Sequence, residues 1–158
     1  PLINGLLKTG GLDAGINYWN YVARLESQGF KSIIYIEDIL PTLGIDGDLP
    51  LIGYVFKEDL MSKDNDLLKR FFQATYEARK ILEKSDKEWD RIKKLTGAKN
   101  DEMLKTIREG FRKGIPKSNH EVLIRNISKA YNILMDIGGK KLVGEGSKLA
   151  KGTIWYDK

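Results

Sequence analysis

"GGLDAGINYWNYVARLESQGFKSIIYIED" (residues 10–38) carries the strongest indication of fold in this sequence. Residues 12–17 (LDAGIN) form a candidate strand, and residues 18–29 read as a helix that ends in glycine. Residues 30–37 (FKSIIYIE) are rich in Ile and Tyr and read as a second strand. A strand, a helix and a strand at this spacing are typical of a βαβ unit with parallel pairing. The stretch therefore predicts an α/β fold.

The rest of the chain predicts one more strand and then helices. Residues 50–57 (PLIGYVFK) read as a third strand, whereas residues 64–84 place apolar side chains three and four positions apart, as in a long amphipathic helix. Ser85 with Glu88, and Ser118 with Glu121, match capping boxes at the starts of later helices. Three strands make a thin sheet for an α/β domain. We therefore expect that strands from an N-terminal half are missing from this chain, or that a second copy supplies them and the chain dimerises.

Composition limits the class of protein. The chain has 158 residues, 41% of them hydrophobic, which is enough for one ordinary core, and it has no cysteine for a disulfide or a thiolate metal site. No apolar run approaches the roughly 18 residues of a membrane span. Residues 1–100 hold 15 basic and 15 acidic side chains, and residues 101–158 hold 12 and 7, interspersed as on solvated surfaces. No dense basic stripe or nucleic-acid-binding motif is found, so we expect no nucleic-acid partner.

Catalytic and metal-binding patterns are weak. His120 is the single histidine and lies in a capping segment, which disfavours a Ser-His-Asp triad or a zinc site. The acidic pairs at 37–38 and 58–59 are interpreted as helix openings, where negative charge suits the helix dipole. The sequence therefore predicts no enzyme activity, no metal and no cofactor.

A ligand site is predicted where the first strand meets the helix. Asn17, Tyr18, Trp19 and Asn20 bring amide, phenol and indole groups to the edge of a parallel sheet at which ligands bind. This arrangement suits a small polar or anionic solute held against an aromatic ring. In the alternative interpretation, Trp19 packs onto the sheet and one of the asparagines caps the helix.

Three motifs give the chain a family resemblance. Residues 10–14, 53–56 and 71–74, within longer similar stretches at 10–34 and 49–82, together with the end of the chain from "GG" to "GTIWYD", carry it. They resemble the second half of periplasmic substrate-binding proteins of the nitrate/sulfonate/taurine ABC-transport family, which are related in fold to pyrimidine-precursor proteins of thiamine biosynthesis.

The resemblance implies a periplasmic-binding-protein type II-like fold. It assigns residues 1–36 to the end of a second lobe, 37–52 to a crossover and hinge, and 53–158 to a mostly helical return to the first lobe. It implies a non-catalytic protein, periplasmic or otherwise extracytoplasmic, that binds a small-molecule solute in an interlobe cleft and presents it to an ABC permease in the membrane.

The resemblance also assigns the site residues. It places Asn17, Tyr18, Trp19 and Asn20 in the cleft, adds Tyr54 as a further ligand-binding residue, and gives Asp13 a structural role beside the site. Two alternatives stay open: an enzyme or binder of the pyrimidine-precursor type, and a stand-alone helical interaction module.

Overall fold

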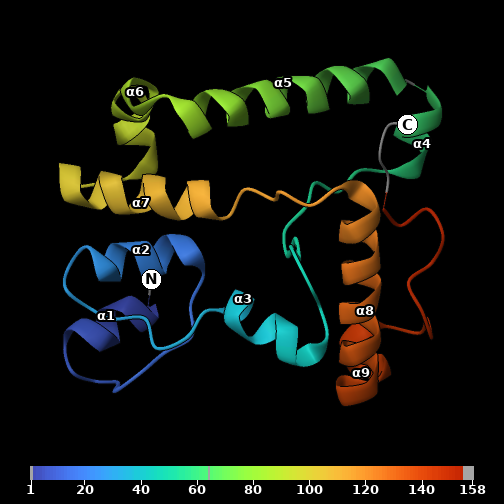
Figure 1. The fold of residues 1–158 in the computed structure, drawn as a ribbon, viewed down its shortest axis with the longest axis horizontal. Coiled ribbons are helices and arrows are strands. Elements are labelled where there is room, and N and C mark those ends of the chain that lie inside the picture. Colours follow the sequence, from blue (N-terminus) through green and yellow to red (C-terminus); the bar gives the residue numbers. More distant parts are fainter. Residues whose placement is uncertain (1, 64, 155–158) are drawn as a thin grey trace. The chain divides into compact units, whose positions relative to one another are not determined.

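The computed structural model describes residues 2–63 and 65–154, and it is a helical protein. Helix accounts for 62% of the structure, and the described residues contain no β-strand (Figure 1). The α/β, periplasmic-binding-protein type II-like fold expected from the sequence is therefore wrong. The helices are α1 (Leu2–Lys8), α2 (Trp19–Glu26), α3 (Ile36–Ile39), the 3-10 helix η1 (Leu40–Leu43), α4 (Glu58–Lys63), α5 (Asn65–Lys84), α6 (Asp86–Thr96), α7 (Asp101–Lys113), α8 (His120–Gly138) and α9 (Lys140–Val143).

The three predicted strands are mostly irregular segments. Residues 12–17 and 50–57 have no regular structure, and the end of segment 30–37 begins α3. Helix α3 starts there because the Asp38 carboxylate accepts a hydrogen bond of 3.0 Å from the Tyr35 backbone N–H, which caps the turn. The remaining segments are apolar but have no neighbouring strand, and a strand is stabilised by the hydrogen bonds and side-chain pairs of a partner.

The main helix predictions are confirmed, unlike the strand predictions, because a helix depends on residues that are close together in the sequence. The long amphipathic segment forms α5, and Ser85 caps α6 by accepting a hydrogen bond of 3.3 Å from the Glu88 backbone N–H, as predicted. The second capping prediction is wrong in its residue. Asn119, not Ser118, caps α8 through a 3.0 Å hydrogen bond from the Val122 backbone N–H.

The chain divides into two compact units. Unit 1 comprises the residues up to Ile33 together with Arg70–Ile115, and unit 2 comprises Ile34–Lys69 together with the residues from Pro116 onward. Helix α5 runs from one unit into the other. The division that the resemblance implies, with lobes at 1–36 and 53–158 and a hinge at 37–52, stays a prediction.

Unit 1 is built around Trp89 of α6. Its indole is 3% exposed and donates a hydrogen bond of 2.7 Å to the Leu82 backbone carbonyl, and it packs edge-on against Phe111 with 5.3 Å between ring centroids. The other buried members of this core are Ala23, Met103, Leu104 and Ile107. Helix α2 lies along α7 over this core, and Gly110 of α7 permits the close approach because a Cβ there would lie 3.3 Å from the Trp19 ring (Figure 1).

Unit 2 is held together by a loop, residues 44–48, that is fastened to α8. Asn126 of α8 is 2% exposed, and its amide donates hydrogen bonds of 2.8 and 2.9 Å to the backbone carbonyls of Asp46 and Asp48. Gly47, between these two residues, has a φ of 85°, which side chains rarely adopt. This polar clamp joins segments that lie about 80 residues apart in the chain.

The Asp48 carboxylate completes the clamp. It accepts hydrogen bonds of 2.8 and 2.6 Å from the backbone N–H groups of Lys117 and Ser118, just before α8 begins. The pKa of Asp48 is held below its usual value, chiefly by a hydrogen bond with the Ser118 side chain and further by these two backbone donors, against a smaller effect of burial. Ser118 thus forms hydrogen bonds with Asp48 of the loop, and Asn119 caps α8 instead.

Candidate functional site

An open hollow in unit 1 is the candidate binding site. Its volume is about 330 Å³, at the small end of the range of about 300–1,000 Å³ for ligand pockets. Three helices contribute its lining residues: Trp19, Asn20 and Arg24 from α2, Trp89, Ile92, Leu95 and Thr96 from α6, and Ile107 from α7. The hollow therefore depends on the packing of α2 against α6 and α7 within one unit.

Helical periodicity explains why these side chains share one wall. On α2, Asn20 and Arg24 are four residues apart and lie on the same face of the helix. The α6 residues that line the hollow follow spacings of three and four positions, so that they form one apolar stripe ending in Thr96. The two walls differ in chemistry, since α2 supplies polar groups and α6 mainly apolar ones.

The two tryptophans have different positions in the hollow. Trp19 is 44% exposed at the start of α2, whereas Trp89 is 3% exposed and belongs to the core. The rings of Trp19 and Phe111 are 6.5 Å apart, so aromatic packing continues from the core to the surface. A ligand here would contact an accessible indole above a rigid apolar floor.

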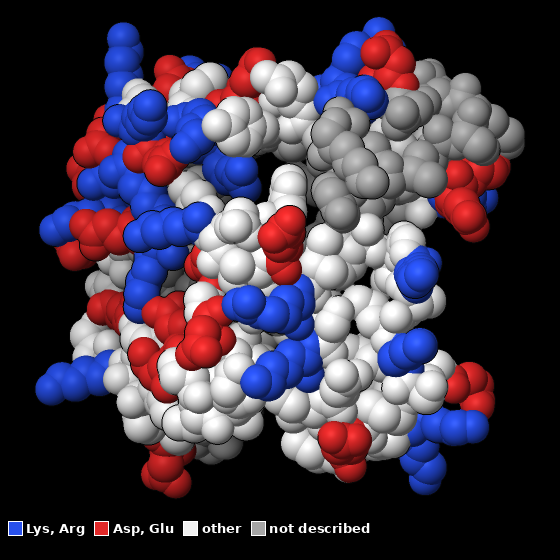
Figure 2. Space-filling model, turned by 45° about the vertical axis from the view of Figure 1, so that its right-hand side comes forward, with Lys and Arg blue, Asp and Glu red and all other residues white. Residues whose placement is uncertain are grey.

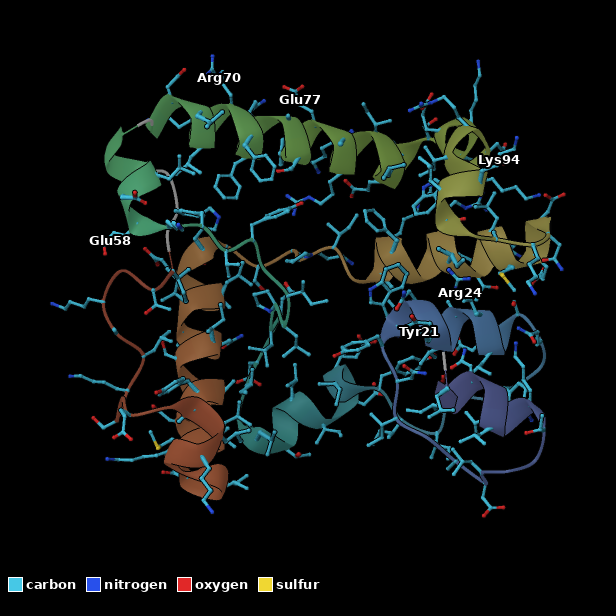
Figure 3. The ribbon with its side chains drawn as sticks, turned by 180° about the vertical axis from the view of Figure 1, so that it is seen from behind. Tyr21, Arg24, Glu58, Arg70, Glu77 and Lys94 are labelled. Carbon is cyan, nitrogen blue, oxygen red and sulfur yellow. The ribbon has the colours of Figure 1, made fainter. Side chains whose placement is uncertain are left out.

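Arg24 supplies the strongest hydrogen-bond donor of the site (Figure 3). Its guanidinium donates hydrogen bonds of 2.7 Å to the Thr96 carbonyl and 3.4 Å to the Gly97 carbonyl, which joins α2 to the C-terminal end of α6. Its Nε–H is buried and has no hydrogen-bond partner among the residues that the structure describes. A buried donor without a partner is costly, and because Nε has almost no exposed surface, an acceptor group of a ligand would reach it only after the surrounding side chains moved.

The structure brings two of the predicted binding residues together at this hollow. Trp19 and Asn20 line it, whereas Tyr18 is the 70% exposed residue that precedes α2. The Asn17 amide donates a 2.7 Å hydrogen bond to the Asn4 side chain, which in turn donates to the Tyr21 backbone carbonyl at 3.0 Å. Asn17 therefore helps to hold α1 and α2 together through Asn4.

The other two predicted residues lie elsewhere. Asp13 is an exposed loop residue, and Tyr54, 62% exposed, belongs to unit 2 and does not line the hollow. The ligand-binding role predicted for Tyr54 and the structural role predicted for Asp13 beside the site stay predictions.

Sequence reasoning missed Arg24 and the whole α6 wall. Arg24 could have been found, because it is one helical turn beyond Asn20 in a segment that was already interpreted as a helix. The α6 residues gave no such signal, since they lie about 70 residues away from α2 in the chain. Trp89 lines the same hollow as Trp19, so the fluorescence of both tryptophans is expected to respond to a ligand there.

No cluster of three or more acidic or histidine side chains that could hold a metal ion is found in the part of the chain that the structure describes. Within the same residues, no helix is long and apolar enough to cross a membrane. In comparisons with known proteins, no protein-family model and no curated protein matches this chain.

Proposed function

We propose that the protein binds a small organic solute in the hollow of unit 1 and does not convert it chemically. The observation that carries this proposal is the combination of an accessible indole, an apolar floor and an arginine with a buried, unpartnered Nε–H in one hollow. Ligand sites in proteins commonly have this composition, with mostly apolar walls and a few placed polar groups.

The same residues favour a class of ligand. Trp19 offers a flat apolar surface, and Arg24 and Asn20 offer donors on the α2 wall. We expect a solute with a small apolar or planar body and an acceptor group such as a carboxylate, a sulfonate or a ring carbonyl, because arginine pairs well with such groups. The volume of the hollow limits the solute to a small molecule.

Delivery of the solute to an ABC permease outside the cytoplasm is the second part of the proposal. The resemblance of residues 10–34 and 49–82 to solute-binding proteins is its support. The helical structure does not support hinge-closing lobes, so the proposal includes binding and delivery and leaves the lobes out.

A stand-alone helical interaction module is the second candidate, and the helical architecture favours it. If its partner were a polyanion, we would expect basic side chains to dominate a face. Figure 2 instead shows basic and acidic side chains intermingled on the face that it presents. Binding through a basic surface would also weaken steeply with added salt, which separates the two candidates.

Tryptophan fluorescence and thermal melting against a panel of sulfonates, nitrate, carboxylates, pyrimidines and amino acids test the proposal. A ligand should give a saturable fluorescence change and a higher melting temperature. Asn20→Ala should weaken the binding about two- to tenfold, the equivalent of about one hydrogen bond, because Asn20 lines the hollow.

Gln73→Ala is the matched control, since Gln73 is an exposed residue of α5 whose side-chain amide donates a hydrogen bond of 2.7 Å to the Glu77 carboxylate and does not line the hollow. It should bind as the parent chain does. A folded chain that responds to no member of the panel, or an Asn20→Ala variant that binds with unchanged affinity, would sink the proposal.

A further inference from the structure

Several polar groups that line the hollow already have hydrogen-bond partners within the protein. The Trp89 indole N–H donates to the Leu82 carbonyl at 2.7 Å. The Thr96 hydroxyl donates to the Lys93 carbonyl at 2.7 Å and accepts from the Ala98 backbone N–H at 3.2 Å. A ligand could use these groups only by displacing a partner that the fold supplies.

Arg24, the charged residue in the lining, is engaged in the same way. Its Nη1 and Nη2 donate to the carbonyls of Gly97 and Thr96, and its Nε is buried. A carboxylate or sulfonate pairs best with arginine through two parallel N–H groups. An anion in the hollow would therefore have to displace the α6 carbonyls or open the packing around Nε, so the guanidinium is poorly placed to bind it.

Two neutral groups in the lining have no partner. The indole N–H of Trp19 and the side-chain amide of Asn20 make no hydrogen bond in the part of the chain that the structure describes. The Asn20 amide atoms also keep contact with solvent, since the buried side-chain atoms that lack a partner do not include them. The hollow therefore offers a ligand an unpaired amide, which is both donor and acceptor, together with an accessible aromatic ring.

We propose that the solute is a neutral, planar cyclic amide that lies against the Trp19 indole and pairs its N–H and C=O with the Asn20 side-chain amide. This inference rests on the proposed function and narrows it, because it selects a ring carbonyl over a carboxylate or a sulfonate. A cyclic amide matches the donor and the acceptor of Asn20 at once. A neutral ligand also avoids the cost of moving a charge from water onto the apolar walls that Ile92 and Ile107 provide.

The Trp19 ring is supported before a ligand arrives. A Cβ at Gly110 would lie 3.3 Å from Cε3 and 3.6 Å from Cζ3 of the indole, so this edge of the ring rests on the backbone of α7. The Phe111 ring lies 6.5 Å from the Trp19 ring. A ring that is already packed on its own protein loses little conformational freedom when a planar ligand stacks on it.

Three small probes test the ligand class. One is 2-pyridone, which has the N–H and C=O of a cyclic amide; its N-methyl derivative lacks the N–H, and benzoate is a planar anion of similar size. Proton–nitrogen NMR spectra of the full chain follow binding through the indole N–H signals, and Trp19→Phe identifies the signal of Trp19. The Trp89 signal reports whether a variant is folded, since its N–H bonds to the Leu82 carbonyl in the core.

We expect 2-pyridone to shift the Trp19 signal saturably, and the other two probes to bind about two- to tenfold more weakly, the equivalent of one hydrogen bond. Asn20→Ala should weaken the binding of 2-pyridone by the same factor and remove its advantage over the N-methyl derivative. Gln73→Ala, which changes an exposed residue of α5 away from the hollow, should leave all three affinities as in the parent chain.

Two results would overturn the amide ligand while the proposed function stands. One is benzoate binding as tightly as 2-pyridone, and the other is a folded Asn20→Ala variant that still prefers 2-pyridone over its N-methyl derivative. A folded parent chain that responds to none of the three probes would overturn the amide ligand as well, whereas the proposed function itself fails only when the wider panel of solutes is also silent.

Discussion

Asn126→Asp is the substitution that tests the polar clamp of unit 2 most directly. The two side chains have nearly the same shape, so the variant changes chemistry and leaves packing volume almost unchanged. The Asn126 amide donates to the carbonyls of Asp46 and Asp48 at 2.8 and 2.9 Å. A carboxylate at this position has no proton to donate and would face two carbonyl oxygens.

The magnitude follows from the burial of the group. Loss of two hydrogen bonds costs about 2 kcal/mol, and placing a charge at the buried position 126, where it faces two carbonyl oxygens, adds about 1–3 kcal/mol. We therefore expect the variant to lose about 3–5 kcal/mol of the free energy of unfolding at neutral pH. Burial raises the folded-state pKa of the new carboxyl, so its cost should be smallest below the unfolded-state value of about 3.9 and should grow as the pH rises above it.

Urea unfolding followed by far-UV circular dichroism measures this loss, with parent and variant compared at neutral and acidic pH. We expect the midpoint of the variant to fall by at least about 1 M urea at neutral pH. Asn119→Asp is the matched control on the same helix. Asn119 caps α8, and aspartate caps as well as asparagine does, so its midpoint should stay within a few tenths of 1 M.

One result would refute the reasoning. If Asn126→Asp unfolds within about 0.5 kcal/mol of the parent chain at neutral pH, then the buried amide does not hold loop 44–48 to α8. A cost that does not change with pH would contradict the charge argument while leaving the hydrogen bonds in place.

Three further substitutions test other parts of the structure. Trp89→Phe should lower the free energy of unfolding by about 2 kcal/mol, since it removes ring volume from the core and the hydrogen bond to the Leu82 carbonyl; calorimetry would contradict this if the melting temperature stayed unchanged. Asp48→Asn should cost about 1 kcal/mol at neutral pH. Because the folded-state pKa of Asp48 is lowered, its contribution exists above the unfolded-state pKa of about 3.8 and disappears on acidification, so urea midpoints of parent and variant should converge below that pH; a constant difference would exclude this linkage. Gly47→Ala should cost about 1–2 kcal/mol in the same assay, since its φ is 85° and a Cβ would lie 3.0 Å from the Ser118 hydroxyl; equal midpoints would show that the loop can readjust.

The candidate site was predictable only in part. Trp19 and Asn20 were found because an indole and an amide stand out at the start of a helix, and Arg24 follows them at helical spacing. Trp89 and Ile107 could not be assigned to the same site from the sequence, because no local rule pairs residues that lie far apart along the chain. The Asn126 clamp was missed for the same reason.

The sequence by itself determined α2, α5, α6 and α8, including the extent of α5, the Ser85 cap of α6 and the glycines that follow α2 and α8. These features depend on side chains within one or two helical turns of each other, so the spacing of nearby residues in the sequence predicts them. Tertiary structure decided the state of residues 12–17, 30–37 and 50–57. Their composition favours strands, but a strand also needs a partner at hydrogen-bonding distance, and no described segment supplies one. Tertiary packing likewise made the hollow, since its walls come from helices that only the folded chain brings together.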